Sequence, residues 1–350
     1  MSTAEIDPAL SGSRARFRVA RSTTGSRIAT AVAVGGAAAL FSVPTLFTAN
    51  IVQQLTSLFL FVILAVMWNA LAGYGGMISV GQQAFIGFGA YATIWLTQQG
   101  MAPFPAMVLA ALVSAALAVV VALVVLHLKG GQFAVGSWVV AETLMLLAIM
   151  NHSLGGGTGI SLGGLNDYAP EVRQAYVYWL TLAFLVILLV SLFLLLRLRT
   201  GAALQAIRDD EEAAAALGVR VGPIKFGIFV LAGLGCGGAG ALILANTLFI
   251  QPQSIFGVQW SAYMIFMVLV GGLGTFEGPI VGAVIFFLVQ QQFADYGAWY
   301  LVGLGLVAVL FALFLPRGLW SIVADRLPVQ MPVGYMLRPT DRRSNAPEST

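Results

Sequence analysis

Apolar stretches long enough to cross a lipid bilayer recur along almost the whole chain. A membrane-spanning helix needs about 20 predominantly apolar residues. The candidate segments lie at about 28–48, 51–72, 78–98, 104–127, 134–150, 175–196, 224–249, 258–272, 278–293 and 297–316. Three of them are short (134–150, 258–272 and 278–293) and one is rich in glycine (78–98). Eight full crossings with additional broken or re-entrant pieces are therefore the alternative to ten crossings.

Composition explains why such a chain needs lipid around it. Hydrophobic residues make up 59% of the 350 residues and charged residues 9%, whereas soluble domains are about 45–50% apolar and about 25% charged. The sequence predicts an all-α integral membrane protein, a polytopic helical bundle of about 10 (8–10) transmembrane segments with broken glycine-rich helices. The single cysteine, Cys236, excludes an intramolecular disulfide and a cysteine-cluster metal site.

The lysines and arginines predict how the chain is oriented. All of the 17 except Arg173 lie in the N-terminal tail, after the fourth segment, between the sixth and seventh segments, or in the C-terminal tail. Ten crossings place these four stretches on one side, which the positive-inside rule makes cytoplasmic. We expect a cytoplasmic tail at 1–27, a membrane domain at 28–316 containing a cytoplasmic loop at 197–223, and a cytoplasmic tail at 317–350.

Ionisable residues are almost absent from the apolar segments, and this excludes several functions. Membrane enzymes, proton-coupled transporters and charge-lined channels place such residues inside the bundle. Neither Lys129 nor Lys225 follows the glycine pattern of a P-loop, so this chain does not hydrolyse ATP. The exception is Glu142, in the fifth segment. It is either a residue of a pathway or packing network, or a carboxylate near the interface on a short, displaced helix.

Two glycine-rich segments, one in each half of the chain, favour a central path built from broken helices. Glycine allows a helix to unwind where it lines a cavity, and it also allows close backbone contact. Tight helix packing alone is therefore the alternative, and it is the simplest reading of the glycines between Gly233 and Gly240. The candidate path residues are Gly73, Tyr74, Gly75, Ser79, Gly81, Gln82, Phe85, Gly89, Tyr91, Glu142, Gly271, Gly272, Gly274, Gly278 and Pro279.

An acidic, alanine-rich loop carries the third informative pattern. Alanine favours helix, so a short helix is predicted near 210–217, with Asp209 as its N-cap, Glu212 in reciprocal contact and Gly218 as its stop. Such a helix could dock into a partner and transmit movement, or it could simply connect two membrane segments. The candidate docking residues are Arg208, Asp209, Asp210, Glu211, Glu212, Ala214, Leu217 and Gly218.

Together these motifs resemble the LivM-type permeases of branched-chain amino acid ABC importers. The resemblance covers about 65–325 and rests on four motifs in order. They are Asn-x-Leu-x-Gly-Tyr-x-Gly-x-x-Ser-x-Gly with Ala-Phe-x-Gly-x-Gly-Ala-Tyr (Asn69 to Tyr91), Gly-Gly-x-Gly-Ile (Gly156 to Ile160), Ala-Ile-Arg-Asp-Asp-Glu-x-Ala-Ala-x-x-Leu-Gly (Ala206 to Gly218) and Gly-Gly-Leu-Gly-Thr-x-x-Gly-Pro (Gly271 to Pro279).

The resemblance implies one half of a heterodimeric pore in the bacterial inner (cytoplasmic) membrane, with both termini cytoplasmic. The implied partners are a second, LivH-like permease subunit, two cytoplasmic ABC ATPase subunits that carry ATP and Mg, a periplasmic or extracellular substrate-binding protein, and membrane lipid. No cofactor is expected on this non-enzymatic chain, and no nucleic acid. The acidic loop is then the segment that couples to an ATPase.

The substrate implied by the resemblance is a branched-chain or other hydrophobic amino acid. Ser137-Trp138 and Gln82 depart from the family pattern, so a related importer for urea, short amides or aromatic acids stays open. A stand-alone channel or facilitator for a small neutral solute is the alternative from another class. An assembly subunit ranks last, because it leaves the glycine-rich interruptions unexplained.

Overall fold

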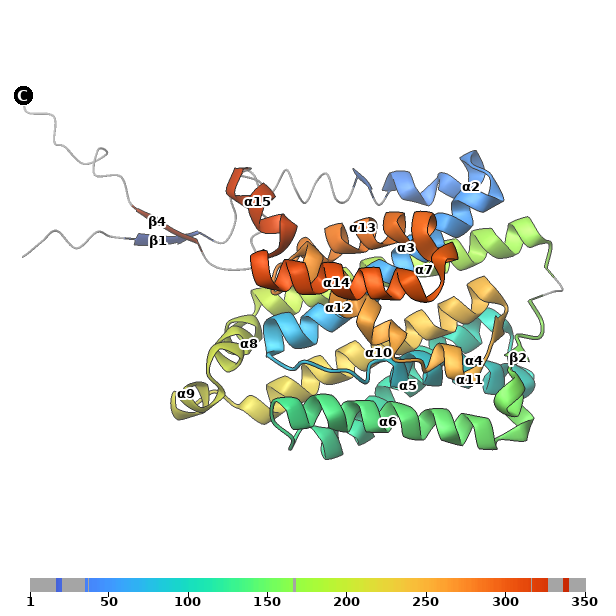
Figure 1. Ribbon diagram of the computed structural model, residues 1–350, viewed down its shortest axis with the longest axis horizontal. Coiled ribbons are helices and arrows are strands. Elements are labelled where there is room, and N and C mark those ends of the chain that lie inside the picture. The colour runs from blue at the N-terminus through green and yellow to red at the C-terminus, as the bar shows by residue number, and fades with distance from the viewer. Residues whose placement is uncertain are drawn as a thin grey trace, which may run out of the picture.

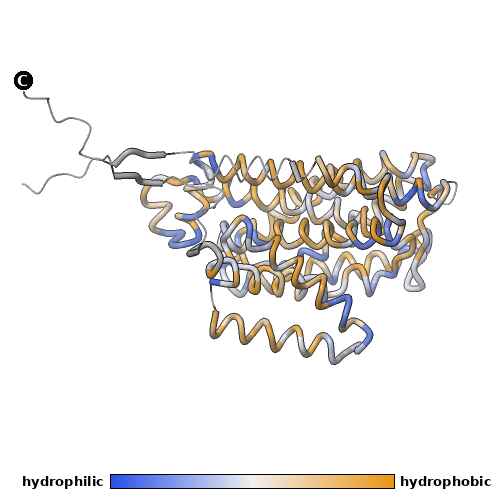
Figure 2. Tube along the Cα trace, turned by 90° about the horizontal axis from the view of Figure 1, so that it is seen from above, coloured by the Kyte–Doolittle hydropathy of each residue, from blue (hydrophilic) through white to orange (hydrophobic). Residues whose placement is uncertain are grey.

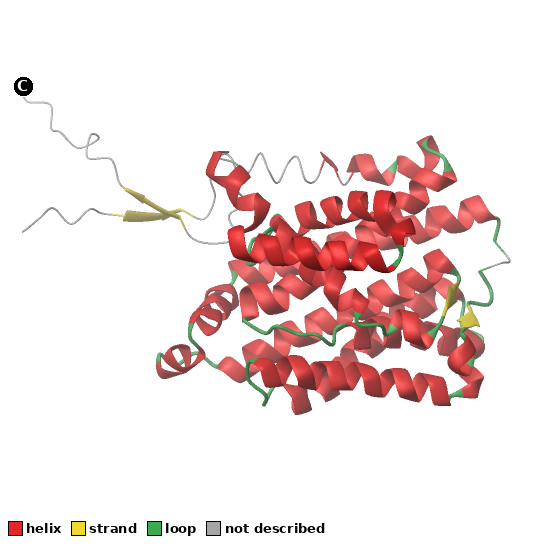
Figure 3. Cartoon of the chain, in the orientation of Figure 1, coloured by secondary structure: helices red, strands yellow, loops and turns green. Residues whose placement is uncertain are grey.

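The computed structural model describes residues 17–20, 35–36, 38–165, 168–315, 317–326 and 336–339, and helices dominate it (Figures 1 and 3). The helices are α2 (Val43–Leu46), α3 (Ala49–Asn69), η2 (Ala70–Tyr74), α4 (Gln83–Gln98), α5 (Pro103–Val125), α6 (Gly131–Met150), η3 (His152–Leu154), η4 (Gly156–Thr158), α7 (Pro170–Arg197), α8 (Arg199–Asp209), α9 (Glu211–Ala216), α10 (Val221–Thr247), α11 (Pro252–Ile255), α12 (Gln259–Gly271), α13 (Gly278–Phe293), η5 (Ala294–Tyr296), α14 (Ala298–Phe314) and α15 (Gly318–Arg326). Two short antiparallel pairs complete the described chain, β1 (Phe17–Ala20) with β4 (Met336–Pro339) and β2 (Ile160–Ser161) with β3 (Phe249–Ile250).

Within the described residues, 7 helical stretches are long and apolar enough to cross a membrane. They are Ala49–Tyr74, Pro103–Val125, Gly131–Met150, Pro170–Arg197, Val221–Thr247, Pro252–Gly271 and Trp299–Ile322. Helices α4 and α13 have 16 residues each and are shorter, and part of the predicted segment 28–48 lies outside the described residues. The all-α polytopic fold is confirmed, while the count of about ten crossings stays a prediction.

Hydropathy along the helices matches a membrane slab. Hydrophobic residues fill the middle of the bundle, and hydrophilic residues gather towards its two ends (Figure 2). Helices α8 and α9 lie at one end of the bundle and β2 lies at the other (Figure 1). The helices therefore run from one polar surface to the other, as a multi-pass membrane protein requires.

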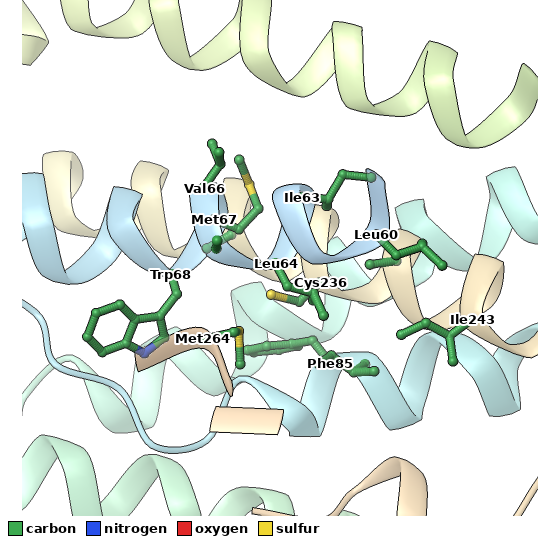
Figure 4. Close-up of a cluster of buried hydrophobic side chains, with 14 of the residues drawn as sticks. Leu60, Ile63, Leu64, Val66, Met67, Trp68, Phe85, Cys236, Ile243 and Met264 are labelled. Atoms are coloured by element: carbon green, nitrogen blue, oxygen red, sulfur yellow. The ribbon is translucent and has the colours of Figure 1, made fainter. Parts of the chain in front are cut away.

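Helices α3 and α10 form the centre of the bundle. In each of them, 83% of the most apolar window is buried, against 22% for α6. Figure 4 shows side chains of α3, among them Leu64 and Met67, packed with Phe85 of α4, Cys236 of α10 and Met264 of α12. Helices α6 and α14 lie at the periphery.

The small-residue face of α10 allows this central packing. Gly235 faces Met67 of α3, Gly237 faces Ser114 of α5 and Gly238 faces Phe184 of α7. A Cβ at Gly240 would overlap the carbonyl oxygen of Ile86 in α4, so the two backbones touch. The prediction that the glycines of this segment serve helix–helix contact is confirmed.

Two interruptions position the candidate site. Residues 76–82, between η2 and α4, form no helix and run as an irregular loop segment alongside the helices (Figure 3). Residues 272–277 form the turn between α12 and α13. Both lie in the glycine-rich segments of the sequence, although the predicted helix at 78–98 begins only at Gln83.

Candidate translocation site at two interrupted helices

The first interruption begins where α3 widens. Its last turn, η2, is a π-helix over Ala70–Tyr74, a geometry that is rare and frequent at functional sites. The amide N–H of Met77 still donates to the carbonyl of Leu71 (3.0 Å), and the chain then runs extended to Gln82. Both Tyr74 and Gly75 are buried, so they lie inside the bundle at this turn.

Side chains of neighbouring helices satisfy the extended backbone. Trp68 Nε1 donates to the carbonyl of Ser79 (2.8 Å), and Gln83 Nε2 donates to that of Val80 (2.9 Å). The amide N–H of Val80 donates to Ser137 Oγ of α6 (3.2 Å). Non-helical backbone at membrane depth needs such protein partners or a water-filled cavity. The fold therefore stabilises this segment in its non-helical conformation.

Ser79 and the two glutamines extend this network. Ser79 Oγ accepts from the amide N–H of Gly81 (3.3 Å) and from Gln82 Nε2 (3.2 Å). Ser261 Oγ of α12 donates to Gln83 Oε1 (2.5 Å). Within the described residues, the buried Gln82 Oε1 has no hydrogen-bond partner. Polar groups thus collect around the broken helix, deep in an otherwise apolar bundle.

Three predicted path residues further along α4 pack in the core instead. Phe85 meets the ring of Phe229 edge-on (5.7 Å between centroids), and Tyr91 stacks on Phe256 (5.9 Å). A Cβ at Gly89 would overlap the carbonyl of Gly237 in α10. At these positions the side chains and the glycine serve tight helix packing. This is the alternative to a role in the path that the sequence left open.

The second interruption is a tight turn between α12 and α13. Gly272 and Gly274 have φ angles of +137° and +74°, which favour glycine. Thr275 Oγ1 donates to the carbonyl of Gly272 (2.8 Å) and accepts from the amide N–H of Gly278 (3.1 Å). Pro279 lies in the first turn of α13, where its missing N–H costs nothing. Gly271 and Gly278 let the start of α13 pack against the end of α12, since a Cβ at Gly271 would overlap the carbonyl of Gly278.

Asn69 joins the two interruptions. Its Oδ1 accepts from the amide N–H of Gly274 (2.8 Å), and its Nδ2 donates to the carbonyl of Thr275 (2.9 Å). A Cβ at Gly73 would overlap both the Asn69 side chain and the backbone of Gly274. Sequence reasoning did not select Asn69 as a site residue. The signal that could have found it is a polar amide inside an apolar segment, just before the glycine-rich motif.

Arg208 reaches the same junction from the loop. Its Nη1 donates to the carbonyl of Gly73 (2.9 Å), while Nε and Nη2 hold Asp209 Oδ1 (3.1 and 3.0 Å). A Cβ at Gly76 would lie 3.1 Å from the Cα of Arg208. The side chain of Arg208 stays partly exposed, but it ties α8 to the point where the two glycine-rich segments meet.

The loop forms two helices, α8 and α9. The predicted helix near 210–217 is confirmed as α9, and Gly218 ends it with a φ angle of +85°. The predicted N-cap was wrong. Asp209 is the last residue of α8, and Asp210 has the extended backbone of an N-cap, so its Oδ1 accepts from the amide N–H groups of Glu212 (2.9 Å) and Ala213 (3.0 Å). Glu212 is therefore one position too early for the predicted reciprocal contact.

The acidic residues of α9 are engaged within the chain. Glu211 forms an ion pair with Lys225 of α10, and Glu212 lies 3.6 Å from Lys129. Ala214 is buried, whereas Leu217 is 86% exposed. The surface that α9 offers outward is therefore apolar at Leu217.

Glu142 is half-buried on α6, beside the exposed Trp138. Its Oε1 accepts from Trp138 Nε1 (2.9 Å) one turn earlier. Eleven residues separate Glu142 from the start of α6 at Gly131, which is about 16 Å at 1.5 Å per residue. This places the carboxylate near the middle of α6.

These features define a class of protein. A helical bundle that crosses the membrane several times, with a broken helix and a tight turn that meet beside an amphipathic loop, is a membrane transport protein. Within the described residues, no group of three His, Cys, Asp or Glu side chains could hold a metal ion.

Comparison with known proteins gives the family. The family described as "Branched-chain amino acid transport system / permease component" matches residues 50–317, and the chain belongs to it. It resembles the high-affinity branched-chain amino acid transport system permease protein LivM of Salmonella typhimurium, with 28% identity over 314 residues that cover 82% of this chain and 74% of the relative. LivM of Escherichia coli is 26% identical over the same coverage. No solved structure matches the chain.

Membership of this family has direct consequences. The chain is a transport subunit and not an enzyme, and it is a multi-pass protein of the inner membrane. ATP hydrolysis belongs to separate ATPase components, and substrate capture to a binding-protein component. The resemblance seen in the sequence motifs is thereby confirmed.

Proposed function

We propose that this permease subunit forms half of the path of an importer for branched-chain or other hydrophobic amino acids. A second permease subunit would form the other half, and two cytoplasmic ATPase subunits with ATP and Mg would drive the cycle. The names of the LivM relatives support this substrate class. The exposed Ile78 in the extended segment fits an apolar substrate better than urea or a short amide.

The observation that carries the proposal is the contact between Arg208 and the carbonyl of Gly73. It connects the loop at one end of the bundle with the junction of the two interrupted helices. A shift of α8 and α9 therefore reaches the broken helices through a charge-assisted hydrogen bond. This is the mechanical link that an ATP-driven transporter needs between its motor and its path.

We assign different roles to the residues of the loop. Leu217 would enter an apolar pocket on an ATPase subunit, because it is exposed while Ala214 packs against the bundle. Asp210, Glu211 and Glu212 would shape and hold α9. Arg208 would pass the movement to the path residues Gly73, Tyr74, Gly75, Ser79, Gly81, Gln82, Gly271, Gly272, Gly274, Gly278 and Pro279.

The orientation follows from the same roles. The ATPase subunits are cytoplasmic, so the end that carries α8 and α9 would face the cytoplasm. In Figure 1, β1 and β4 lie at this same end. This supports a cytoplasmic location for both the N-terminal and the C-terminal tail. The binding protein would then dock at the opposite end, which carries η3, η4 and β2.

The test uses the complete transporter in proteoliposomes, with labelled leucine and ATP hydrolysis measured together. Arg208→Ala is expected to lower uptake while the ATPase subunits stay bound and active, because the motor remains attached but the link to the path is lost. Leu217→Asp is expected to abolish ATPase binding, and with it uptake. Ala202→Asp, on the exposed side of α8, adds the same charge elsewhere in the loop and serves as the control.

Two outcomes would contradict the proposal. Unchanged uptake in both loop variants would remove the coupling role. Flux of a small neutral solute through liposomes that contain this chain alone, without ATP, would support a facilitator instead. A panel of leucine, phenylalanine, phenylacetate and urea as competitors of uptake would decide the substrate class.

A further inference from the structure

Helix α6 presents most of its surface outward. It lies along one edge of the bundle (Figure 1), and Val135, Val139 and Leu146 are each more than half exposed. The apolar side chains on this surface are compatible with contact with lipid. The carboxylate of Glu142, which is paired with Trp138 on the same surface, is not.

A carboxylate in the middle of a span is costly against hydrocarbon. Glu142 lies near the middle of α6, and the one hydrogen bond that the structure gives it comes from Trp138. A carboxylate has room for several more donors. Its position therefore points to a further polar partner or to water, and not to lipid.

Helix α14 offers a comparison. The stretch Trp299–Ile322, which contains most of α14, is even more exposed than α6, with 12% of its apolar window buried against 22%. The sequence of α14, Ala298–Phe314, contains no Asp, Glu, His, Lys or Arg. The long exposed rows of α5 and α7 are likewise apolar away from the helix ends, for example at Val120 and Ile187. The contrast marks α6 as different from the surfaces that contact lipid.

A second feature adjoins α6. The extended segment 76–82 is held to it by the hydrogen bond from the Val80 amide to Ser137 Oγ. Ile78 in this segment is 58% exposed, and Gly76, Met77 and Ile78 line one groove with Phe133 and Ala134 of α6 and with the charged residues Lys129, Glu211 and Lys225. The groove therefore opens at the polar end of the bundle that carries α9. A charged groove beside α6 and the carboxylate of Glu142 both favour a polar or protein neighbour over lipid on this side of the molecule.

We infer that this side is where the second permease subunit packs, with a spanning helix whose side chain donates a hydrogen bond to Glu142. The surface, termed the α6 face, consists of Val135, Trp138, Val139, Glu142, Leu146 and the neighbouring Ile78. The inference rests on the proposed function, because it takes the second permease as the occupant. It specifies a donor on that subunit, such as a serine, threonine, asparagine or glutamine in an otherwise apolar helix. The extended segment would then line the path between the two subunits.

Photo-crosslinking in the native complex tests the placement. A photoreactive amino acid is placed at Val139 or Leu146 on the α6 face, and at Leu306 of α14 or Val120 of α5 as controls. The four side chains are closely matched in exposure, between 55% and 60%. Protein adducts with the second permease are expected from the first two positions, while the two controls yield lipid adducts alone.

Two substitutions test the hydrogen bond. Glu142→Leu removes the carboxylate and would suit a lipid-facing position, whereas Glu142→Gln keeps hydrogen-bonding capacity. If the inference holds, Glu142→Leu lowers the fraction of second permease that co-purifies by about three- to tenfold, the size of an interhelical hydrogen bond in a membrane. Glu142→Gln is expected to retain most of it. The yield of monodisperse chain is measured for each variant, so that a folding defect is recognised.

The outcomes separate this inference from the proposed function. Adducts with a second permease from Leu306 or Val120 but not from the α6 face would overturn the inference and leave the importer intact. Adducts between two copies of this chain, or lipid adducts alone at Val139 and Leu146, would also overturn it. If no second permease co-purifies with the unmodified chain, the proposed function itself fails.

Discussion

Asn69 and Arg208 together hold the junction of the interrupted helices. One amide bonds two backbone groups of the α12–α13 turn, and one guanidinium bonds the carbonyl of Gly73. Backbone groups freed by the breaks in the helices are thereby satisfied by side chains from elsewhere in the sequence. The junction depends on few residues, so single substitutions there should have large effects.

Replacing Asn69 by Ala is expected to destabilise the turn. The partly buried Gly274 amide and Thr275 carbonyl would lose their partners, at a cost of up to about 1 kcal/mol each, because a fully buried unpaired group costs about 1–3 kcal/mol. The thermal stability of the purified subunit in detergent, measured by loss of monodispersity, should fall together with uptake. Asn246→Ala, which removes a single hydrogen bond to Ser57, is the matched control and should cost less. Equal losses of stability in the two variants would contradict the proposal that Asn69 holds the turn between α12 and α13.

Gly73 and Gly75 offer a comparison two residues apart. A Cβ at Gly73 would overlap Asn69 Oδ1 and the backbone of Gly274, whereas one at Gly75 would meet the flexible end of Met77 at 3.2 Å. Gly73→Ala should cost roughly 1–3 kcal/mol and force the two segments apart, while Gly75→Ala should be nearly silent. Uptake rates of the two variants check this, and similar rates would contradict the close approach at Gly73.

At this scale the sequence indicates which residues break the helices better than it indicates what each side chain contacts. The glycine-rich motifs correctly marked the broken helices, because glycine and proline interrupt helices whatever surrounds them. The loop pattern assigns Arg208 to the docking surface, yet its partly exposed side chain reaches back to the carbonyl of Gly73. The direction of a side chain depends on which distant segment lies opposite, and one sequence without the fold cannot supply that.

At the scale of elements, α9 depends on its cap and its ion pairs. Asp210 satisfies two amide groups at the start of the helix, and the pair between Glu211 and Lys225 attaches the helix to α10. The contact of Glu212 with Lys129 is exposed and adds little. A helix of 6 residues has little stability of its own, so these contacts decide whether it forms.

Asp210→Ala is therefore expected to fray α9. Loss of an N-cap costs about 0.5–2 kcal/mol, which is large for so short a helix. Hydrogen exchange of residues 211–217 should become faster, and the stimulation of ATP hydrolysis in the complex should fall. Asp209→Ala, which removes a residue that caps nothing, should leave the exchange of α9 unchanged. Faster exchange in that variant instead would restore the sequence-based assignment of the cap.

Other elements lay beyond sequence reasoning. The apolar pattern covers 51–72 and 78–98 as if both were uniform helices, but the chain widens into η2 and then runs extended until α4 begins at Gln83. The hydrogen bonds that support this break come from Trp68, Ser137 and Gln83 on three different helices. Hydropathy indicates whether a segment suits an apolar environment. It does not indicate which side chains of other helices will bond its backbone.

At the scale of the whole molecule, the positions of α9 and η3 at opposite ends give a direct test of orientation. The native Cys236 is buried, so a cysteine introduced elsewhere is the thiol that a reagent reaches. A cysteine at Leu217 should react with a membrane-impermeant maleimide in inside-out vesicles, and one at Ser153 in right-side-out vesicles. The reverse pattern would invert the proposed orientation, and labelling of both from one side would contradict the fold.

The contact between α4 and α10 has a mechanical consequence. At Gly89 and at Gly240 the backbones of the two helices touch, so no flexible side chain lies between them to absorb a displacement. We expect spin labels placed on α4 and α10 to keep a constant separation throughout the transport cycle, whereas labels on α8 and α12 change theirs. Near its N-terminal end α10 carries Lys225, which binds α9, and α4 begins where the extended segment ends. The pair would then move as one rigid unit between the loop helix α9 and the extended segment.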